Sequence, residues 1–254
     1  MACVRVTLLV FFMFIIAGFT NEECFGMEVC MPSAVKGPMD EVIAEFRALY
    51  GLKPGDINAI YEPADIHQAR IKTGEVGDVF VFACDDPELF KIMPSRIKEE
   101  TRKEIVLKAL SVGLPEGNPM GIQGLEDILK LPVVIGAVST ERGDDQGMAT
   151  AKMIDELGIE DKLYNRLKLV PTGKELLPML LKDEVQALFC WDITEAFNPG
   201  KLDIVKTFGD RYTKPVFIAV TRQSKQPDLS LAFVEYSVSE QSRQRFQEHG
   251  FPLP

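Results

Sequence analysis

Cysteines are the side chains of this 254-residue chain with the clearest potential for ligand chemistry. Cys30, Cys84 and Cys190 each come at the end of a segment that we expect to be a β-strand. Carboxyl ends of parallel strands meet at one edge of a sheet, where ligands bind. Thiolates at that edge would suit soft ligands such as Cu(I), or thiophilic species such as trivalent arsenic. The alternatives are that each cysteine is a small buried hydrophobic residue, or that two of them form a disulfide.

A thiol enzyme is the second chemistry that these residues suggest. Cys190 and Asp192 with a distant histidine could form a nucleophile and its base, but the chain has only two histidines and lacks the local sequence signature of such enzymes. We therefore predict no enzymatic activity and no cofactor. A net charge of −10 argues against a nucleic-acid partner.

These residues are positioned by an alternation of short apolar strands and amphipathic helices. Its regularity predicts an α/β fold with right-handed crossovers and mostly parallel sheets. The expected strands are Glu28–Met31, Ile57–Tyr61, Asp78–Phe82, Ile105–Leu110, Val133–Val138, Leu167–Val170, Ala187–Phe189 and Val216–Val220. The expected helices are Pro38–Tyr50, Ile66–Thr73, Pro87–Met93, Leu125–Leu129, Gly147–Leu157, Gly173–Lys182, Leu229–Ser237 and Glu240–His249.

The amino-terminal segment has the pattern of a secretory signal peptide. Arg5 is followed by an apolar run from Val6 to Phe19, which at about 14 residues is short for a membrane span of roughly 20. Small residues before Met27 predict cleavage there, so residues 1–26 are the expected signal peptide and the mature protein is expected in the periplasm. Cleavage would remove Cys3 and Cys24 and leave three cysteines. An uncleaved anchor is the alternative.

Three segments carry a resemblance to a known family. They are Gln68–Asp86 (QARIKTGEVGDVFVFACDD), Gly121–Leu129 (GIQGLEDIL) and Asp183–Ile193 (DEVQALFCWDI), and the chain also ends on a similar Gly250-Phe251. In this order and spacing they resemble periplasmic solute-binding proteins of the molybdate-binding type, the capture subunits of ABC importers. The resemblance implies two Rossmann-like lobes joined by two crossing strands, with a ligand cleft between them. Lobe one would be residues 27–108 plus 215–254, and lobe two residues 109–214.

The resemblance also implies the ligand-binding positions. The family's two serine donors fall on Ala34, with Ser33 beside it, and on Ala64 or Asp65. Backbone donors of lobe two would come from Gln146 or Gly147 and from Gly173, and the family's tyrosine corresponds to Trp191, whose indole N–H can still donate. The set of expected ligand-binding residues is therefore Ser33, Ala34, Ala64, Asp65, Gln146, Gly147, Gly173 and Trp191. Oxyanions are bound by such neutral donors at helix N-termini.

Local structure offers simpler roles for several of these residues. Ser33 can be a turn residue, and Asp65 is expected to cap the helix that follows it. Trp191 can be part of the core. We expect Glu62 to be a solvated residue at the rim of the cleft and His67 to lie on the surface.

The leading hypothesis is a monomeric periplasmic protein that captures a small inorganic oxyanion such as molybdate or tungstate. It would close its cleft around this small anionic ligand and deliver it to the membrane permease of an ABC transporter. One alternative is the same fold retuned to a soft metal ion or an arsenite-like ligand through Cys30, Cys84 and Cys190. Another alternative is a ligand sensor for a membrane receptor.

Overall fold

A computed structural model describes residues 26–83, 87–141, 144–195, 197–205 and 208–254. Cys3, Cys24, Cys84 and residues 1–25, which hold nearly all of the expected signal peptide, lie outside this range. The strands are β1 (Met27–Pro32), β2 (Ile57–Glu62), β3 (Val79–Phe82), β4 (Lys103–Pro115), β5 (Ile135–Val138), β6 (Leu167–Val170), β7 (Ala187–Trp191), β8 (Leu202–Val205) and β9 (Thr213–Val220). The helices are α2 (Lys36–Tyr50), α3 (Ala64–Thr73), α4 (Pro87–Ile92), α5 (Leu125–Lys130), α6 (Asp145–Leu157), α7 (Glu160–Leu163), α8 (Leu176–Leu181), α9 (Pro227–Ser237) and α10 (Glu240–Glu248).

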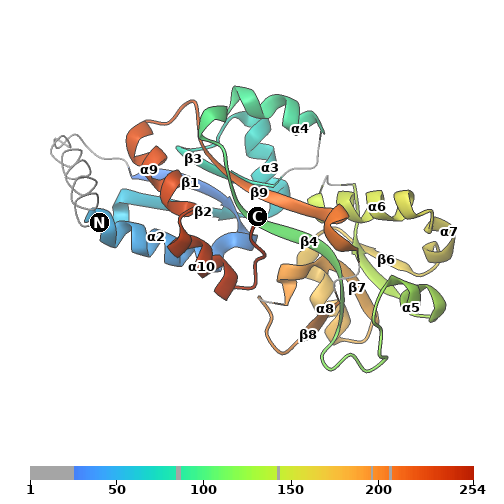
Figure 1. The fold of residues 1–254 in the computed structure, drawn as a ribbon. Coiled ribbons are helices and arrows are strands. Elements are labelled where there is room, and N and C mark those ends of the chain that lie inside the picture. Colours follow the sequence, from blue (N-terminus) through green and yellow to red (C-terminus); the bar gives the residue numbers. More distant parts are fainter. Residues whose placement is uncertain (1–25, 84–86, 142–143, 196, 206–207) are drawn as a thin grey trace, which may run out of the picture.

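The strands form a continuous path in the order β2-β1-β3-β9-β4-β7-β5-β6, with β8 also paired to β4. Pairing is parallel between β1 and its neighbours β2 and β3, and between β5 and its neighbours β6 and β7. The pairs that involve β4 or β9 are antiparallel. Two Rossmann-like units therefore meet at β4 and β9, as Figure 1 shows.

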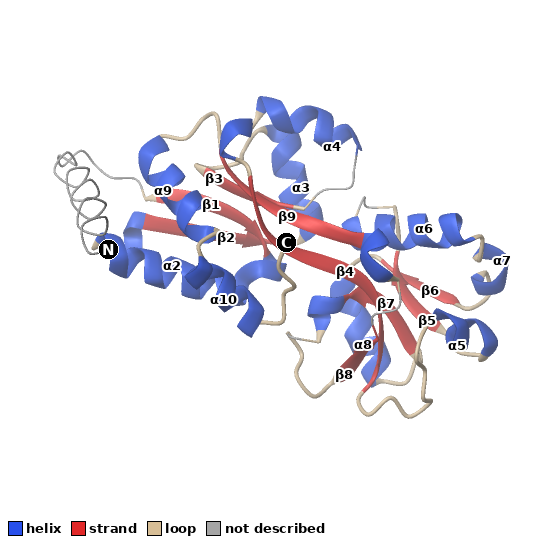
Figure 2. Cartoon of the chain, in the orientation of Figure 1, coloured by secondary structure: helices blue, strands red, loops and turns tan. Residues whose placement is uncertain are grey.

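Lobe one, the unit built on β1, β2, β3 and β9, is a three-layered sandwich (Figures 1 and 2). Helices α2, α9 and α10 cover one face of its sheet, and α3 and α4 cover the other. Side chains of β3 alternate accordingly, since Val79 and Val81 join the core under α2 while Phe80 and Phe82 join the core under α3 and α4. A buried run of four apolar residues is the pattern expected of a strand covered on both faces.

Lobe two, the unit built on β5, β6, β7 and β8, has the same construction. Alternate residues of β7 belong to different cores: Phe189 and Trp191 pack with the main core, whereas Leu188 and Cys190 pack toward α8. Its strands β5, β6 and β8 have four residues each, and β7 has five. Among the described residues, no helix combines the length and the apolar character needed to cross a membrane.

Strand β4 connects the two lobes. Its first half, through Ala109, pairs with β9, and its second half, from Leu110, pairs with β7 and β8. The chain returns to lobe one just before β9, so two segments cross between the lobes side by side (Figure 1). The change of partner lies next to the predicted boundary between residues 108 and 109, but the exact boundary stays a prediction.

Local sequence signals explain why most helices form where they were expected. In α2 the buried residues Met39, Val42, Ile43 and Phe46 recur at helical spacing, and Gly51 ends the helix with a φ of 66°. Gly74 ends α3 in the same left-handed conformation.

The structure differs from the sequence expectations in three elements. Strand β4 extends over 13 residues rather than the six expected. It is this long because its first half pairs with β9 and its second half pairs with β7 and β8. Strand β8 and the short helix α7 were not predicted. Strand β8 has only four residues and no alternating pattern of its own, and its pairing with β4 defines it.

Candidate functional site

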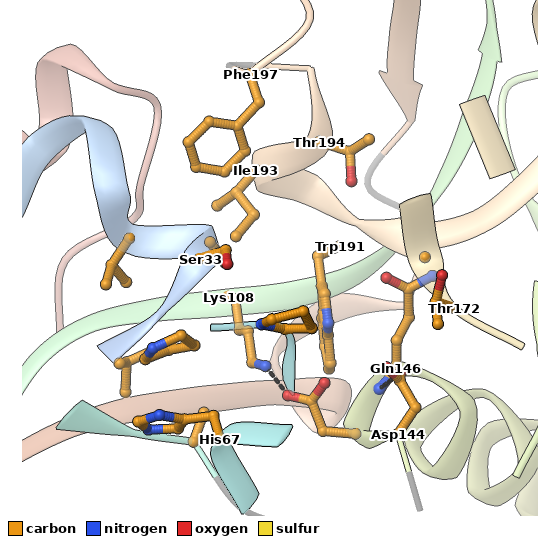
Figure 3. A pocket seen from close by; sticks show the side chains of 18 of the residues that line it. Ser33, His67, Lys108, Asp144, Gln146, Thr172, Trp191, Ile193, Thr194 and Phe197 are labelled. Atoms are coloured by element: carbon orange, nitrogen blue, oxygen red, sulfur yellow. Dashed lines mark hydrogen bonds and ion pairs between the residues drawn. The ribbon is translucent and has the colours of Figure 1, made fainter. Parts of the chain in front are cut away.

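A pocket of about 330 Å³ lies between the two lobes. Turns that follow strands of both lobes converge on it, and Lys108 of strand β4 lies among the lining residues (Figure 3). This convergence is expected at the carboxyl ends of parallel strands in doubly wound sheets. The lining residues are Pro32, Ser33, Ala34, Val35, Pro63, His67, Gln68, Ala83, Lys108, Asp144, Asp145, Gln146, Thr172, Gly173, Lys174, Trp191, Ile193, Thr194, Phe197, Val216 and Phe251.

Five of the eight residues expected to bind ligand line this pocket. Ser33 and Ala34 are exposed on the short 3-10 turn after β1, which lies in lobe one. Gln146, Gly173 and Trp191 contribute from lobe two. The structure therefore brings these five residues together around one pocket.

The other three expected residues are placed differently. Gly147 is not part of the pocket lining, because its Cα packs against the end of β5, where an added Cβ would lie 2.6 Å from the Ser139 carbonyl oxygen. Ala64 and Asp65 form the first turn of α3, and their side chains lie outside the described part of the structure. The expectation that Asp65 caps this helix is wrong, since the N-cap position is held by Pro63.

The N-terminus of α6 is occupied by the chain's own carboxylate. Asp144 accepts hydrogen bonds from the backbone N–H groups of Gln146 (2.9 Å) and Gly147 (3.3 Å). Burial, followed by the neighbouring Asp145, raises the pKa of Asp144. The two amides that were expected to face a ligand therefore donate to Asp144 in this structure.

A buried ion pair forms part of the pocket floor. The Lys108 ammonium on β4 is bonded to the Asp145 carboxylate at the start of α6, and both side chains are about nine-tenths buried. The ammonium also lies 4.2 Å from the centroid of the Trp191 ring, a cation–π contact. Sequence reasoning did not select Lys108 or Asp145. The available signal was a lysine within the apolar strand Ile105–Leu110.

His67 is buried, which corrects the expectation of a surface residue. Its Nε2–H donates to the Val81 carbonyl oxygen (2.6 Å), and its ring stacks on Phe80 at a centroid distance of 4.3 Å. Burial lowers the pKa of His67 to about 4, against an ordinary value of 6.5. Glu62 is not a solvated rim residue either, because it receives two hydrogen bonds from Arg70 (2.5 and 2.7 Å), and these lower its pKa.

We expect His67 to make stability depend on pH. Its pKa is lower in the folded state than in the unfolded state, so the unfolded state binds more protons between pH 6.5 and 4. Stability is unaffected above pH 6.5 and falls as pH drops through this window, by about 2 kcal/mol at pH 5. Urea unfolding of the wild type and His67→Gln at pH 7 and pH 5 measures this: the variant should lose about 2 kcal/mol less between the two values. An equal loss of stability in the wild type and His67→Gln would contradict the assignment. So would a control variant, His249→Gln, whose loss between the two pH values is reduced by the same amount.

Cys30 and Cys190, the two candidate cysteines within the described residues, do not line the pocket. Cys30 in β1 is buried in the core with Phe80 and Phe82, and Cys190 in β7 is buried in a separate core of lobe two. Within the described part of the chain both are free thiols, and no group of three or more His, Cys, Asp or Glu side chains could hold a metal ion. The expectation that strand position would bring these thiols to the cleft is wrong for Cys30 and Cys190. The Cys30 side chain packs into the core under α3 and α4, and the Cys190 side chain packs into the core under α8, so neither lines the pocket.

These two thiols are expected to be inert in the folded protein. Burial raises the pKa of Cys30 and of Cys190 to about 12, from an ordinary value near 9. The thiolate fraction at neutral pH therefore falls by about a thousandfold, and alkylation should slow accordingly. Iodoacetamide labelling followed by peptide mass mapping measures this, with the urea-unfolded protein as reference. Labelling of either peptide at the unfolded rate would contradict the expectation.

The mixed α/β fold, with a pocket between two lobes, resembles that of class II periplasmic binding proteins. The chain belongs to the family described as "Bacterial extracellular solute-binding protein", whose model matches residues 27–252. It is thus an extracellular solute-binding protein, and this family is one of binding proteins rather than enzymes, in agreement with the prediction from the sequence. No curated protein matches the sequence significantly.

Solved structures with a similar fold share little sequence with this chain. A substrate-binding domain from Clostridium difficile, assigned to a molybdenum ABC transporter, has 19% identity and a TM-score of 0.74, covering 90% of this chain and 99% of that one. L-phospholactate-bound Peb3, a Campylobacter jejuni protein, has 15% identity and a TM-score of 0.69, with coverages of 90% and 100%. The periplasmic molybdate-binding protein of Azotobacter vinelandii has 14% identity and a TM-score of 0.68, with coverages of 90% and 99%. At these identities the likeness concerns the fold alone.

Proposed function

We propose that this protein is the capture subunit of an ABC importer and that it binds a small solute with an anionic group between its lobes. One observation carries the proposal: the interlobe pocket contains the buried ammonium of Lys108 and is lined from both lobes. Ser33 and Thr172 add hydroxyl donors on opposite sides of the pocket. A site of this kind can bind an anionic group with both hydrogen bonds and charge.

Closure of the lobes is the mechanism we propose for capture. The two segments that cross between the lobes, β4 and the chain before β9, are the points where the backbone can bend. A solute held by both lobes stabilises the closed form by its contacts with each. The closed form would then be recognised by a membrane permease. A cleaved signal peptide over residues 1–26, a periplasmic location and a monomeric state are parts of this proposal.

The ligand class includes the tetrahedral oxyanions, molybdate and tungstate, that the sequence analysis predicted. Neighbours described as binding molybdate or L-phospholactate support an anionic ligand. The carboxylates of Asp144 and Asp145 act against a dianion, because a second pair of negative charges in a partly buried site is strongly repelled. We therefore propose the broader class, a solute with an anionic group.

A ligand panel tests the proposed function. The probes are molybdate, tungstate, sulfate, inorganic phosphate, phospholactate, short carboxylic acids and amino acids, added to the purified protein. Binding to the native state raises its stability by about 2.7 kcal/mol at a hundredfold excess over Kd, which a thermal-shift assay detects. Small-angle X-ray scattering should show a smaller radius of gyration with the same probe. If no probe shifts the melting temperature, or if the stabilising probe leaves the radius unchanged, the proposed capture of an anionic solute by closure fails.

A further inference from the structure

The charged groups at the floor of the pocket already neutralise one another. Lys108 pairs with Asp145, and Asp144 is held by the amides at the start of α6. Lys174 is the other lysine or arginine among the described residues that line the pocket, and it is exposed at the rim. The buried floor thus contains one positive and two negative side chains.

A charged ligand that binds to Lys108 must either displace the Asp145 carboxylate or bind beside it. An anion that displaces Asp145 leaves a carboxylate in a buried site without its partner, which is strongly unfavourable. An anion that joins Asp145 at the same ammonium places three carboxylates or equivalent charges, with Asp144, around a single positive charge. A cation that takes Asp145 leaves the Lys108 ammonium unpaired in the same way.

We infer that the solute is a zwitterion with an apolar body, a small acid that also carries an amino group, which inserts between Lys108 and Asp145. This inference rests on the proposed function, which it narrows. The anionic group pairs with Lys108 and the ammonium pairs with Asp145, so each buried charge exchanges one partner for another. Both charges of the internal pair remain compensated, and among charged ligands that bind to this pair only one with both signs of charge achieves this.

The walls of the pocket fit the rest of such a molecule. Val35 and Phe251 line it from lobe one, and Ile193 and Phe197 line it after β7, so an apolar body has apolar surface on both sides. A volume of about 330 Å³ lies at the lower end of the range of small-molecule pockets, roughly 300–1,000 Å³, which suits a small organic solute. A bare tetrahedral oxyanion would leave most of this apolar wall in contact with water.

Matched ligands that differ by one charge test the inference. The probes are alanine, valine, leucine and phenylalanine, the corresponding acids without the amino group, and the corresponding amines without the carboxylate. Trp191 is the only tryptophan of the chain and lines the pocket, so its fluorescence reports binding, with calorimetry as a second measurement. We expect at least one amino acid to bind, and removal of either charge to weaken that binding by at least about 100-fold.

The outcomes separate this inference from the proposed function. If a des-amino acid binds as tightly as its amino acid, the inference that the solute is a zwitterion is overturned. The same holds if molybdate, sulfate or phospholactate binds and no amino acid does. In both cases capture of an anionic solute still stands. If no member of either panel binds, the proposed function fails and the inference fails with it.

A variant tests the role of Asp145 without requiring wild-type affinity. Asp145→Asn removes the proposed partner of the ligand ammonium and leaves Lys108 available to an acid. The Kd of the des-amino acid divided by the Kd of the amino acid should fall by about tenfold or more in this variant. Asp155→Asn, at an exposed position of the same helix, is the matched control and should leave the ratio unchanged. If Asp145 had only a structural role, both affinities would fall together and the ratio would stay constant, which would overturn the assignment.

Discussion

Replacing Lys108 by methionine is expected to lower the free energy of unfolding by about 3 kcal/mol. Removal of one partner from a buried ion pair leaves the other charge uncompensated, at a cost of about 3–5 kcal/mol, and the pocket beside this pair brings the value to the lower end. Loss of the contact between the ammonium and the Trp191 ring adds to the effect. Urea unfolding followed by circular dichroism measures the change.

Two further variants separate the ion pair from other effects of the substitution. In Lys108→Met/Asp145→Leu both charges are absent, so stability should return to within about 1 kcal/mol of the wild type. Lys152→Met on α6 removes a lysine whose side chain is 55% exposed, and it should change stability by no more than about 0.5 kcal/mol. A loss below 1 kcal/mol in Lys108→Met, or a double variant less stable than the single one, would contradict the assignment.

Replacing Phe46 by alanine is expected to lower the free energy of unfolding by about 3–5 kcal/mol. The side chain is fully buried where α2 meets α9, with ring centroids 4.3 Å from Tyr50, 5.1 Å from Phe233 and 5.5 Å from Tyr236. Truncation removes the apolar contacts and leaves a cavity between two helices that cannot close over it. Urea unfolding at pH 7 measures the loss.

The control for Phe46 lies one turn further along the same helix. Leu49 is 65% exposed, so Leu49→Ala should change stability by no more than about 0.5 kcal/mol. The pair distinguishes the loss of core packing from a change in helix propensity, which is small for either substitution to alanine. Similar losses in Phe46→Ala and Leu49→Ala would show that the α2–α9 contact does not stabilise lobe one as inferred.

Most of the fold was predictable from the sequence because its signals are local. The periodicity of α2, its closure by Gly51, and the apolar run of β3 are each read within about 15 residues. The pocket-lining turns after β1, β5 and β6 follow strands that were also predicted from the sequence. Strand β8 and the second half of β4 were missed because their formation depends on pairing between segments about 90 residues apart.

The candidate site was predicted less well, for two physical reasons. Side-chain direction in a strand alternates, so a position near the end of a strand does not say which core a side chain enters. Cys30 and Cys190 consequently pack away from the pocket, although Trp191, the next residue after Cys190, lines it. The second reason is that local competition for hydrogen bonds is invisible to a family pattern, and Asp144 occupies the amides of Gln146 and Gly147.

The sequence by itself determined the alternation of strands and helices, the strand-to-helix turns and the resemblance to a two-lobed binding protein, because each depends on patterns among near neighbours in the chain. Only the tertiary structure decided which chemistry those turns enclose. Lys108 and Asp145 are 37 residues apart and lie on a strand and a helix that meet only in the folded molecule. Their pairing, and the burial of Cys30 and Cys190 away from the pocket, follow from the packing of the whole molecule, since burial and charge compensation are set by all the elements that surround a group.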